Sequence, residues 1–182
     1  MRSEENDAQL AARLARGDGA ALDELMRRHE DLVFAVCLRI MGTREAALDA
    51  AQETFLTVFR KADRYKAEAA FSTWLYRVAT NTCFDQLRRN KRRAAEPLPE
   101  YHDPVDPTAA DAFGSVETRP SIEAALQAIP EDYRAAVVLS DVHGLSVADV
   151  AEVLSIPAGT VKSRVFRGRR LLAERLGNLA QT

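Results

Sequence analysis

The stretch IPAGTVKSRVFRGRRLL (Ile156–Leu172) predicts an amphipathic helix with a basic outer face. Its inward face contains Val161 and Val165, continues to Leu172 and Leu176, and includes Gly168, which would allow close approach to another helix. The outward side chains are Lys162, Ser163, Phe166, Arg167 and Arg170, with Arg164 and Arg169 at the flanks. Such a face fits a polyanionic partner, although a solvated basic helix would show the same charge.

The residues before this helix complete a two-helix motif. Ser146 to Asp149 is a Ser-x-x-Asp capping arrangement that opens VADVAEVL, and the turn Ser155-Ile156-Pro157 leads into the basic helix. Together they predict a helix-turn-helix, whose second helix would enter the major groove of DNA by its N-terminal half. Two further helices are predicted upstream, SIEAALQAI ending at Pro130 and PEDYRAAVVLSDV beginning there.

A proline-rich acidic window, residues 94–118, separates this segment from the rest of the chain. It holds four of the seven prolines and six Asp and Glu with no Lys or Arg, whereas residues 1–93 carry 17 Lys and Arg against 14 Asp and Glu. Proline and like-charge repulsion oppose a packed element, so the window predicts a solvated, flexible linker between two domains. The net charge of -2 therefore averages unlike pieces and does not exclude a polyanionic partner.

Helical periodicity predicts four helices before the linker, near residues 7–16, 20–41, 44–65 and 71–90. The second carries a wide apolar stripe, at whose edge His29 is expected as a core residue. No strand-like alternation of useful length occurs, so the predicted fold class is all-α, with two small helical domains.

The third of these helices carries two faces. The expected core face consists of Leu48, Ala51, Phe55, Val58 and Phe59. The second face consists of Asp49, Gln52, Glu53, Leu56 and Arg60. This second face is either solvated surface or a helix-to-helix docking face, because an aliphatic side chain lies there among hydrogen-bonding ones.

The fourth helix combines aromatic and basic residues. Its aromatic residues are Phe71, Trp74, Tyr76 and Phe84, and they precede the basic run LRRNKRR, which includes Arg88. Aromatic residues usually lie in a core, and a terminal basic run is usually solvated. Arg77 and Asn81 lie one turn apart on the same helix. These residues also fit a nucleic-acid-binding face, on which basic side chains would contact phosphates and aromatic rings would stack on unstacked bases.

Composition argues against several classes of protein. The longest apolar run, LVFAVCL, is much shorter than the roughly 20 residues that cross a bilayer, and MRSEENDAQL lacks the apolar core of a signal peptide. Cys37 and Cys83 form no CxxC pair and fall inside predicted helices, which favours buried thiols. No metalloprotease, phosphate-loop or nucleophile motif is present. We therefore expect a cytoplasmic protein that is not an enzyme, has no cofactor or metal and does not insert into a membrane.

Three motifs in order carry a family resemblance: DAAQETFL, FSTWLYRVATNTCFDQLRR and LSVADVAEVLSIPAGTVKSRVFRGRRLL. They resemble the polymerase-docking stretch, the −10 element helix and the promoter-reading domain of bacterial RNA polymerase sigma factors of the extracytoplasmic-function (ECF) group of the sigma-70 family. With IPEDYRAAVVLSDVHGLS, the resemblance covers about Ala8 to Leu176 apart from the linker. It implies sigma region 2 in residues 7–93, a linker in 94–118 and sigma region 4 in 119–177.

The resemblance also implies functions for individual residues. The family's QETF helix docks on the clamp coiled coil of the polymerase β′ subunit, which points to Asp49, Gln52, Glu53 and Leu56. The family holds a flipped base of the −10 element at the loop before the fourth helix, which points to Tyr65, Lys66, Glu68, Ala69, Arg77, Asn81 and Arg88. The family's last helix reads the −35 element, which points to Thr160, Lys162, Ser163, Phe166, Arg167 and Arg170. The implied partners are core RNA polymerase (β′ clamp and β flap), promoter DNA and an anti-sigma factor.

The chain departs from the family pattern at several positions. Ala50 and Ala51 replace larger aliphatics, Ala67 and Ala69 stand in a loop that is often Gly-Asp-Ser-like, and Gly168 replaces a common Ala. The absence of a long extension after Thr182 argues against sigma subgroups with an added C-terminal domain. Two other functions stay open on the residues alone. One is a self-contained, dimeric helix-turn-helix regulator, and the other is a protein-interaction module whose basic helix is ordinary surface.

Overall fold

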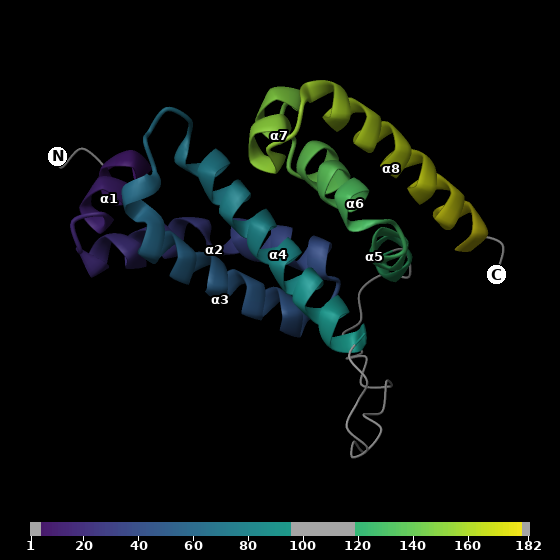
Figure 1. The fold of residues 1–182 in the computed structure, drawn as a ribbon, viewed down its shortest axis with the longest axis horizontal. Helices are drawn as coiled ribbons and strands as arrows, with labels where there is room; N and C mark the ends of the chain where they lie inside the picture. Colours follow the sequence, from purple (N-terminus) through teal and green to yellow (C-terminus); the bar gives the residue numbers. More distant parts are fainter. Residues whose placement is uncertain (1–4, 96–118, 180–182) are drawn as a thin grey trace, which may run out of the picture.

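The computed structural model describes residues 5–95 and 119–179, and all regular structure within these ranges is helical (Figure 1). The first unit comprises α1 (Asp7–Leu14), α2 (Gly19–Met41), α3 (Arg44–Lys61), the short η1 (Ala62–Arg64) and α4 (Phe71–Ala95). The second unit comprises α5 (Arg119–Gln127), α6 (Glu131–Val137), its π-helical continuation η2 (Val138–Val142), α7 (Val147–Leu154) and α8 (Ala158–Leu179). The predicted all-α class is confirmed. Of the expected linker, residues 96–118 lie outside the described part of the chain.

The ends of the helices in the first unit follow from side-chain caps, one glycine and helix propensity. Asp18 accepts a hydrogen bond from the Ala20 N–H at the start of α2, and Thr43 caps α3. Gly42 ends α2 with a φ of 89°, a left-handed conformation that glycine adopts without strain. Helix α4 continues to Ala95, past the predicted end near residue 90, because Lys, Arg and Ala favour a helix.

The first unit builds its core around α2, and α3 is rotated relative to the predicted orientation. Ala47, Ala50 and Thr54 are fully buried, whereas Leu48 and Phe59 are 46% and 49% exposed. The prediction that Leu48 and Phe59 face the core is therefore wrong. Small side chains let α3 approach α2 closely, and a face made of alanines carries little apolar signal in the sequence.

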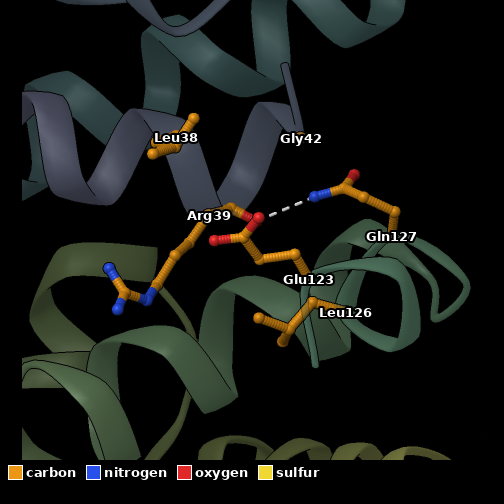
Figure 2. Close-up of a pocket in the computed structure, with 6 residues that line it drawn as sticks. All are labelled: Leu38, Arg39, Gly42, Glu123, Leu126 and Gln127. Atoms are coloured by element: carbon orange, nitrogen blue, oxygen red, sulfur yellow. Dashed lines mark hydrogen bonds between the residues drawn. The ribbon is translucent and has the colours of Figure 1, made fainter. Parts of the chain in front are cut away.

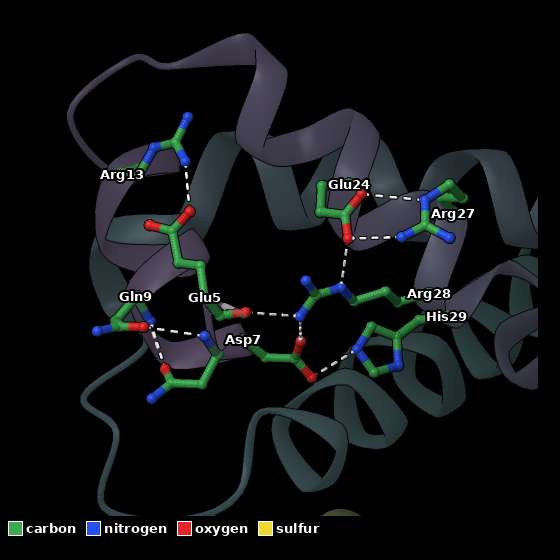
Figure 3. A network of polar contacts seen from close by, with 9 residues as sticks. Glu5, Asp7, Gln9, Arg13, Glu24, Arg27, Arg28 and His29 are labelled. Carbon is green, nitrogen blue, oxygen red and sulfur yellow. Dashed lines mark hydrogen bonds and ion pairs between the residues drawn. The ribbon is translucent and has the colours of Figure 1, made fainter. Parts of the chain in front are cut away.

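A network of ion pairs and hydrogen bonds fastens α1 to α2 (Figure 3). Arg28 lies 3.0 Å from a carboxylate oxygen of Asp7 and 2.6 Å from Glu24, and His29 Nε2 lies 2.7 Å from the other Asp7 oxygen. Hydrogen bonds from Arg27 and Arg28 lower the pKa of Glu24 to about 2. The His29 ring is mostly buried, as predicted, and lies 5.5 Å from the ring of Phe71. The network thereby also supports the start of α4.

The two cysteines are buried free thiols, as predicted. The neighbouring Cys37 thiol and burial both raise the pKa of Cys83, which keeps it protonated and weakly reactive. Among the helices in the described ranges, none has an apolar stretch long enough to cross a membrane.

The second unit is a helix-turn-helix supported by α5 and α6. Ser146 and Asp149 form the predicted capping box, in which each side chain accepts a hydrogen bond from the backbone N–H of the other. A Cβ atom on Gly168 would lie 2.6 Å from Val137 Cγ2 of α6. Helix α8 therefore rests directly on α6 at this glycine, which confirms the close approach expected from the sequence.

The two units pack against each other, with α7 in contact with α4. Leu75 and Ala79 of α4 belong to the same cluster of buried residues as Val150 and Val153 of α7. The sequence predicts separate domains on a flexible linker and gives no indication of this contact. The described parts of the chain form one continuous core.

Candidate nucleic-acid interface

Helix α8 presents a row of unburied polar, cationic and aromatic side chains. Lys162, Ser163, Arg167 and Arg170 are exposed, and Phe166 is 69% exposed. Thr160 is half-buried at the start of the helix, where its carbonyl accepts a hydrogen bond from Ser163 Oγ at 2.9 Å. An aromatic ring left in water beside cations suits a partner that offers both phosphates and base edges.

Two other arginines of α8 are occupied within the second unit. Arg164 lies 3.0 Å from Asp132, and Arg169 donates two hydrogen bonds to Asp141, at 2.8 and 2.6 Å. The Arg169 hydrogen bonds also lower the pKa of Asp141. These pairs hold α8 against α6 and η2, so the two arginines predicted at the flanks serve to position the helix.

An aromatic cluster shapes the loop that joins η1 to α4. The Tyr65 ring packs edge-on against Phe71 at 5.4 Å and lies 5.6 Å from Trp74. The Tyr65 hydroxyl donates to the Ala69 carbonyl at 2.9 Å, which closes the loop on itself. Ala67 has a φ of 54°, a left-handed conformation that costs a non-glycine residue roughly 1–2 kcal/mol. The loop is thus held in one strained shape by the tyrosine.

Two adjoining cavities lie beside α4, one at this loop and the other between α3 and α4. One, of about 270 Å³, is lined by Arg64, Tyr65, Lys66, Ala67, Glu68, Ala69, Trp74, Arg77 and Glu152. The other, of about 220 Å³, is lined by Thr57, Lys61, Arg64, Trp74, Arg77, Val78, Asn81, Thr82 and Asp85. The structure therefore brings together six of the seven residues that the sequence places at this site. The exception is Arg88, which pairs with Asp85 further along α4 and lines neither cavity.

The sequence matches two known families, one in each unit. Residues 25–93 match Sigma-70 region 2, and residues 119–172 match Sigma-70, region 4. Over 178 residues the chain is 40% identical to the ECF RNA polymerase sigma factor SigM of Mycobacterium tuberculosis, covering 98% of this chain and 88% of SigM. The chain belongs to the ECF sigma factor family. It is an alternative sigma factor, a subunit that directs RNA polymerase to promoters.

Other relatives of this ECF sigma factor agree in sequence and in fold. The ECF sigma factor SigW of Bacillus subtilis is 34% identical over 176 residues, covering 90% of this chain and 93% of SigW. The sigma factor RpoE of Bartonella quintana, solved with the anti-sigma factor NepR, has a TM-score of 0.68 at 24% identity, covering 85% of this chain and 96% of RpoE. CnrH, solved with the cytosolic domain of CnrY, has a TM-score of 0.65 at 23% identity, covering 96% and 99%. These two structures share the fold.

On α3, the sigma factor exposes a face that is more apolar than the sequence predicts. Asp49 and Gln52 are exposed, Leu56 is 47% exposed, and Glu53 lies 3.7 Å from Arg60. The misassigned Leu48 and Phe59 join this face. Gln52 also lines a groove of about 290 Å³ with Met26, Glu30, Asp31, Phe34, Arg44, Leu48, Ala51 and Phe55. An apolar strip rimmed by polar groups is typical of a protein-binding surface.

Sequence reasoning missed several residues that line the two cavities of this sigma factor, among them Lys61, Arg64 and Glu152. Lys61 and Arg64 precede Tyr65 in KADRY, and their proximity to the aromatic cluster could have indicated them. Glu152 comes from α7, and only the packing of the two units brings it to the loop. In the part of the chain that the structure describes, no group of three or more His, Cys, Asp or Glu side chains is placed to hold a metal ion.

Proposed function

We propose that α8 reads the −35 element through Thr160, Lys162, Ser163, Phe166, Arg167 and Arg170. This proposal rests on a difference between the cations of α8, some of which are paired within the protein while others are exposed. Arg164 and Arg169 pair with acids of their own unit, while Lys162 and Arg167 stay exposed beside the unburied Phe166. A recognition helix needs cations and an apolar group free to contact phosphates, guanine edges or thymine methyl groups.

The −10 element, in this proposal, binds at the loop before α4. Tyr65, Lys66, Glu68, Ala69 and Arg77 line one cavity, and Asn81 lines the next. Stacking on Tyr65 or Trp74 would hold an unstacked base, and Arg64 and Arg77 would hold its phosphates. Arg88 would act outside the cavities, on the backbone of neighbouring nucleotides.

Polymerase docking is assigned to the face of α3 that carries Asp49, Gln52, Glu53 and Leu56, with the β′ clamp coiled coil as its partner. The second unit would contact the β flap. The functional domains would be residues 7–93 and 119–177, joined by 94–118. Such a subunit works in the cytoplasm, where the polymerase is, and catalyses no reaction itself. The anti-sigma factor NepR bound to RpoE supports an anti-sigma partner for this chain as well.

Two substitutions separate this function from a self-contained regulator. Arg167→Ala should weaken −35-dependent binding by about 1–3 kcal/mol and leave co-purification with core polymerase intact. Arg175→Ala is its control, since it removes an exposed cation from the C-terminal part of α8, outside the proposed recognition face. Leu56→Glu should abolish polymerase binding, because it places a charge in an apolar contact. Ala12→Glu, which adds the same charge at an exposed apolar position of α1, should not. A self-contained regulator would bind its DNA tightly without polymerase and ignore Leu56→Glu.

A further inference from the structure

The cavities of this sigma factor differ greatly in size. The one at the end of α2 has a volume of only about 10 Å³, and the Gln127 side chain at its edge donates to the Arg39 carbonyl at 3.0 Å (Figure 2). Such a volume suits about one water molecule. The loop cavity, of about 270 Å³, and the α3–α4 cavity, of about 220 Å³, are far larger and have room for part of another molecule.

The α3–α4 cavity is built by the first unit. Thr57 and Lys61 line it from α3, and Trp74, Asn81 and Asp85 line it from α4. The three α4 residues are seven and four positions apart, so they share one face of that helix. Every residue that lines this cavity belongs to the first unit, so its shape does not depend on how the two units are arranged.

Two cations and an aromatic ring form the wall between the cavities. Arg64, Arg77 and Trp74 line the loop cavity and the α3–α4 cavity alike. Cations on such a wall are placed to hold a phosphodiester group, and an aromatic ring gives a base apolar contact on either side. A single strand fits this arrangement with one phosphate at the wall and a base in each cavity.

The polar groups of the α3–α4 cavity favour a base that carries an exocyclic amine. Asp85 Oδ1 accepts a hydrogen bond from Arg88, and the carboxylate has further capacity to accept from a ligand. Asn81 is exposed, and its amide can donate to a ring nitrogen. Adenine and cytosine present an amine beside a ring nitrogen, whereas thymine and guanine present a carbonyl oxygen, which a carboxylate repels.

We propose that the α3–α4 cavity is a second base-binding site, which takes the nucleotide next to the one in the loop cavity and selects adenine or cytosine through Asp85. Arg64 and Arg77 hold the phosphodiester group between the two nucleotides. The −10 strand is then read as a step of two nucleotides and not as one unstacked base. The proposal rests on the −10 element binding at the loop before α4, as proposed above.

Single-stranded DNA bound to the holoenzyme tests the second site. The probe is a labelled hexamer of thymidine whose two central bases are varied through all combinations. Fluorescence anisotropy gives its affinity for the full-length chain assembled with core polymerase, and core polymerase alone gives the background. At one of the two positions, adenine or cytosine should bind about tenfold more tightly than thymine or guanine, the factor expected for one hydrogen bond to a charged group.

Asp85→Ala should bring this ratio of affinities close to one and keep the base preference at the other position. Asp85 is exposed, so its replacement should leave the fold intact. The lost charge affects all hexamers alike and cancels in the ratio. Asp23→Ala is the matched control, because it removes an exposed carboxylate of α2 outside both cavities and should keep the wild-type ratio.

An uncharged methylphosphonate between the two central nucleotides tests the phosphate contact. In the preferred hexamer it should weaken binding severalfold for the wild type and for Arg175→Gln, which removes an exposed cation of α8. It should have little effect on Arg64→Gln, which has already lost a cation at the wall between the cavities. An equal loss in Arg64→Gln and the wild type would overturn the assignment of this phosphate to Arg64.

The base preferences separate the failure of the second site from the failure of the −10 site itself. A preference at one position only, unchanged in Asp85→Ala, would mean that a single base is read and that the second site does not exist. A preference at both positions that persists in Asp85→Ala would overturn the selection by Asp85. If neither position shows a preference and Tyr65→Ala binds like the wild type, the −10 element binds elsewhere and both proposals fall. If Tyr65→Ala weakens binding in that case, the −10 site stands and the second site falls.

Discussion

Replacing Gly168 with alanine should destabilise the second unit, although alanine is the better helix former by about 1 kcal/mol. The added Cβ atom would lie 2.6 Å from Val137 Cγ2 and 3.2 Å from the Tyr133 carbonyl oxygen. Val137 is buried and β-branched, so it cannot turn away, and the carbonyl belongs to the backbone of α6. Overpacking of this kind costs about 1–3 kcal/mol, which leaves a net loss of about 1 kcal/mol. For a chain of this size the Tm should fall by about 2–4 °C.

Urea unfolding followed by circular dichroism measures this loss from the midpoint and the slope of the transition. Gly159→Ala is the matched control on the same helix, because nothing lies within 4 Å of a Cβ atom there. That variant should be as stable as the wild type or gain up to about 1 kcal/mol. If the Gly168→Ala protein were at least as stable as the wild type, the close packing of α8 against α6 at Gly168 would be refuted.

Two further predictions concern the contact between the units and the helix-turn-helix. Burial, with a smaller contribution from Arg39, lowers the pKa of His143 while the two units are packed together, and this pKa returns toward 6.5 when they separate. The contact is fully stable above that pH and weakens below it, so the radius of gyration should rise between about pH 7.5 and pH 5.5 in the wild type and stay constant in His143→Gln. Ser146→Ala removes the capping box with Asp149 and should lower the free energy of unfolding by about 1 kcal/mol in the same urea assay; an unchanged midpoint would mean that the cap contributes nothing.

The structure of the second unit was predictable because the features that determine it involve residues close together in the sequence. The Ser146–Asp149 box lies within four residues, and the buried Val161 and Val165 of α8 are one turn apart. Gly168 stands out as a glycine on the inward face of a basic helix. Helix capping, apolar periodicity and a glycine on the inward face each involve residues within one or two turns of a helix. Such features can therefore be recognised in the sequence.

The orientation of α3 and the contact between the units were not predictable by the same reasoning. Apolar periodicity assigns large residues to the core, yet α3 buries Ala47 and Ala50 and exposes Leu48. Arg134 carries a charge, which normally favours solvent, yet it is buried against the end of α2, far away in sequence. Contacts between segments that are distant in the sequence produce no periodic pattern from which they could be predicted.

The ion pairs of Arg164 and Arg169 have a consequence for how α8 would respond to ionic strength. A protein side chain that neutralises a DNA phosphate releases condensed counterions, and each such contact lowers the logarithm of the binding constant by about 0.9 per unit of log salt. If Lys162 and Arg167 alone make such contacts, α8 has a slope of about −1.8, against about −4.5 if Lys162, Arg164, Arg167, Arg169 and Arg170 all did. Because Arg164, Arg169 and Arg170 already have Asp132, Asp141 and Glu174 as counterions, we expect the proposed DNA binding by α8 to depend less on salt than the run RVFRGRR implies.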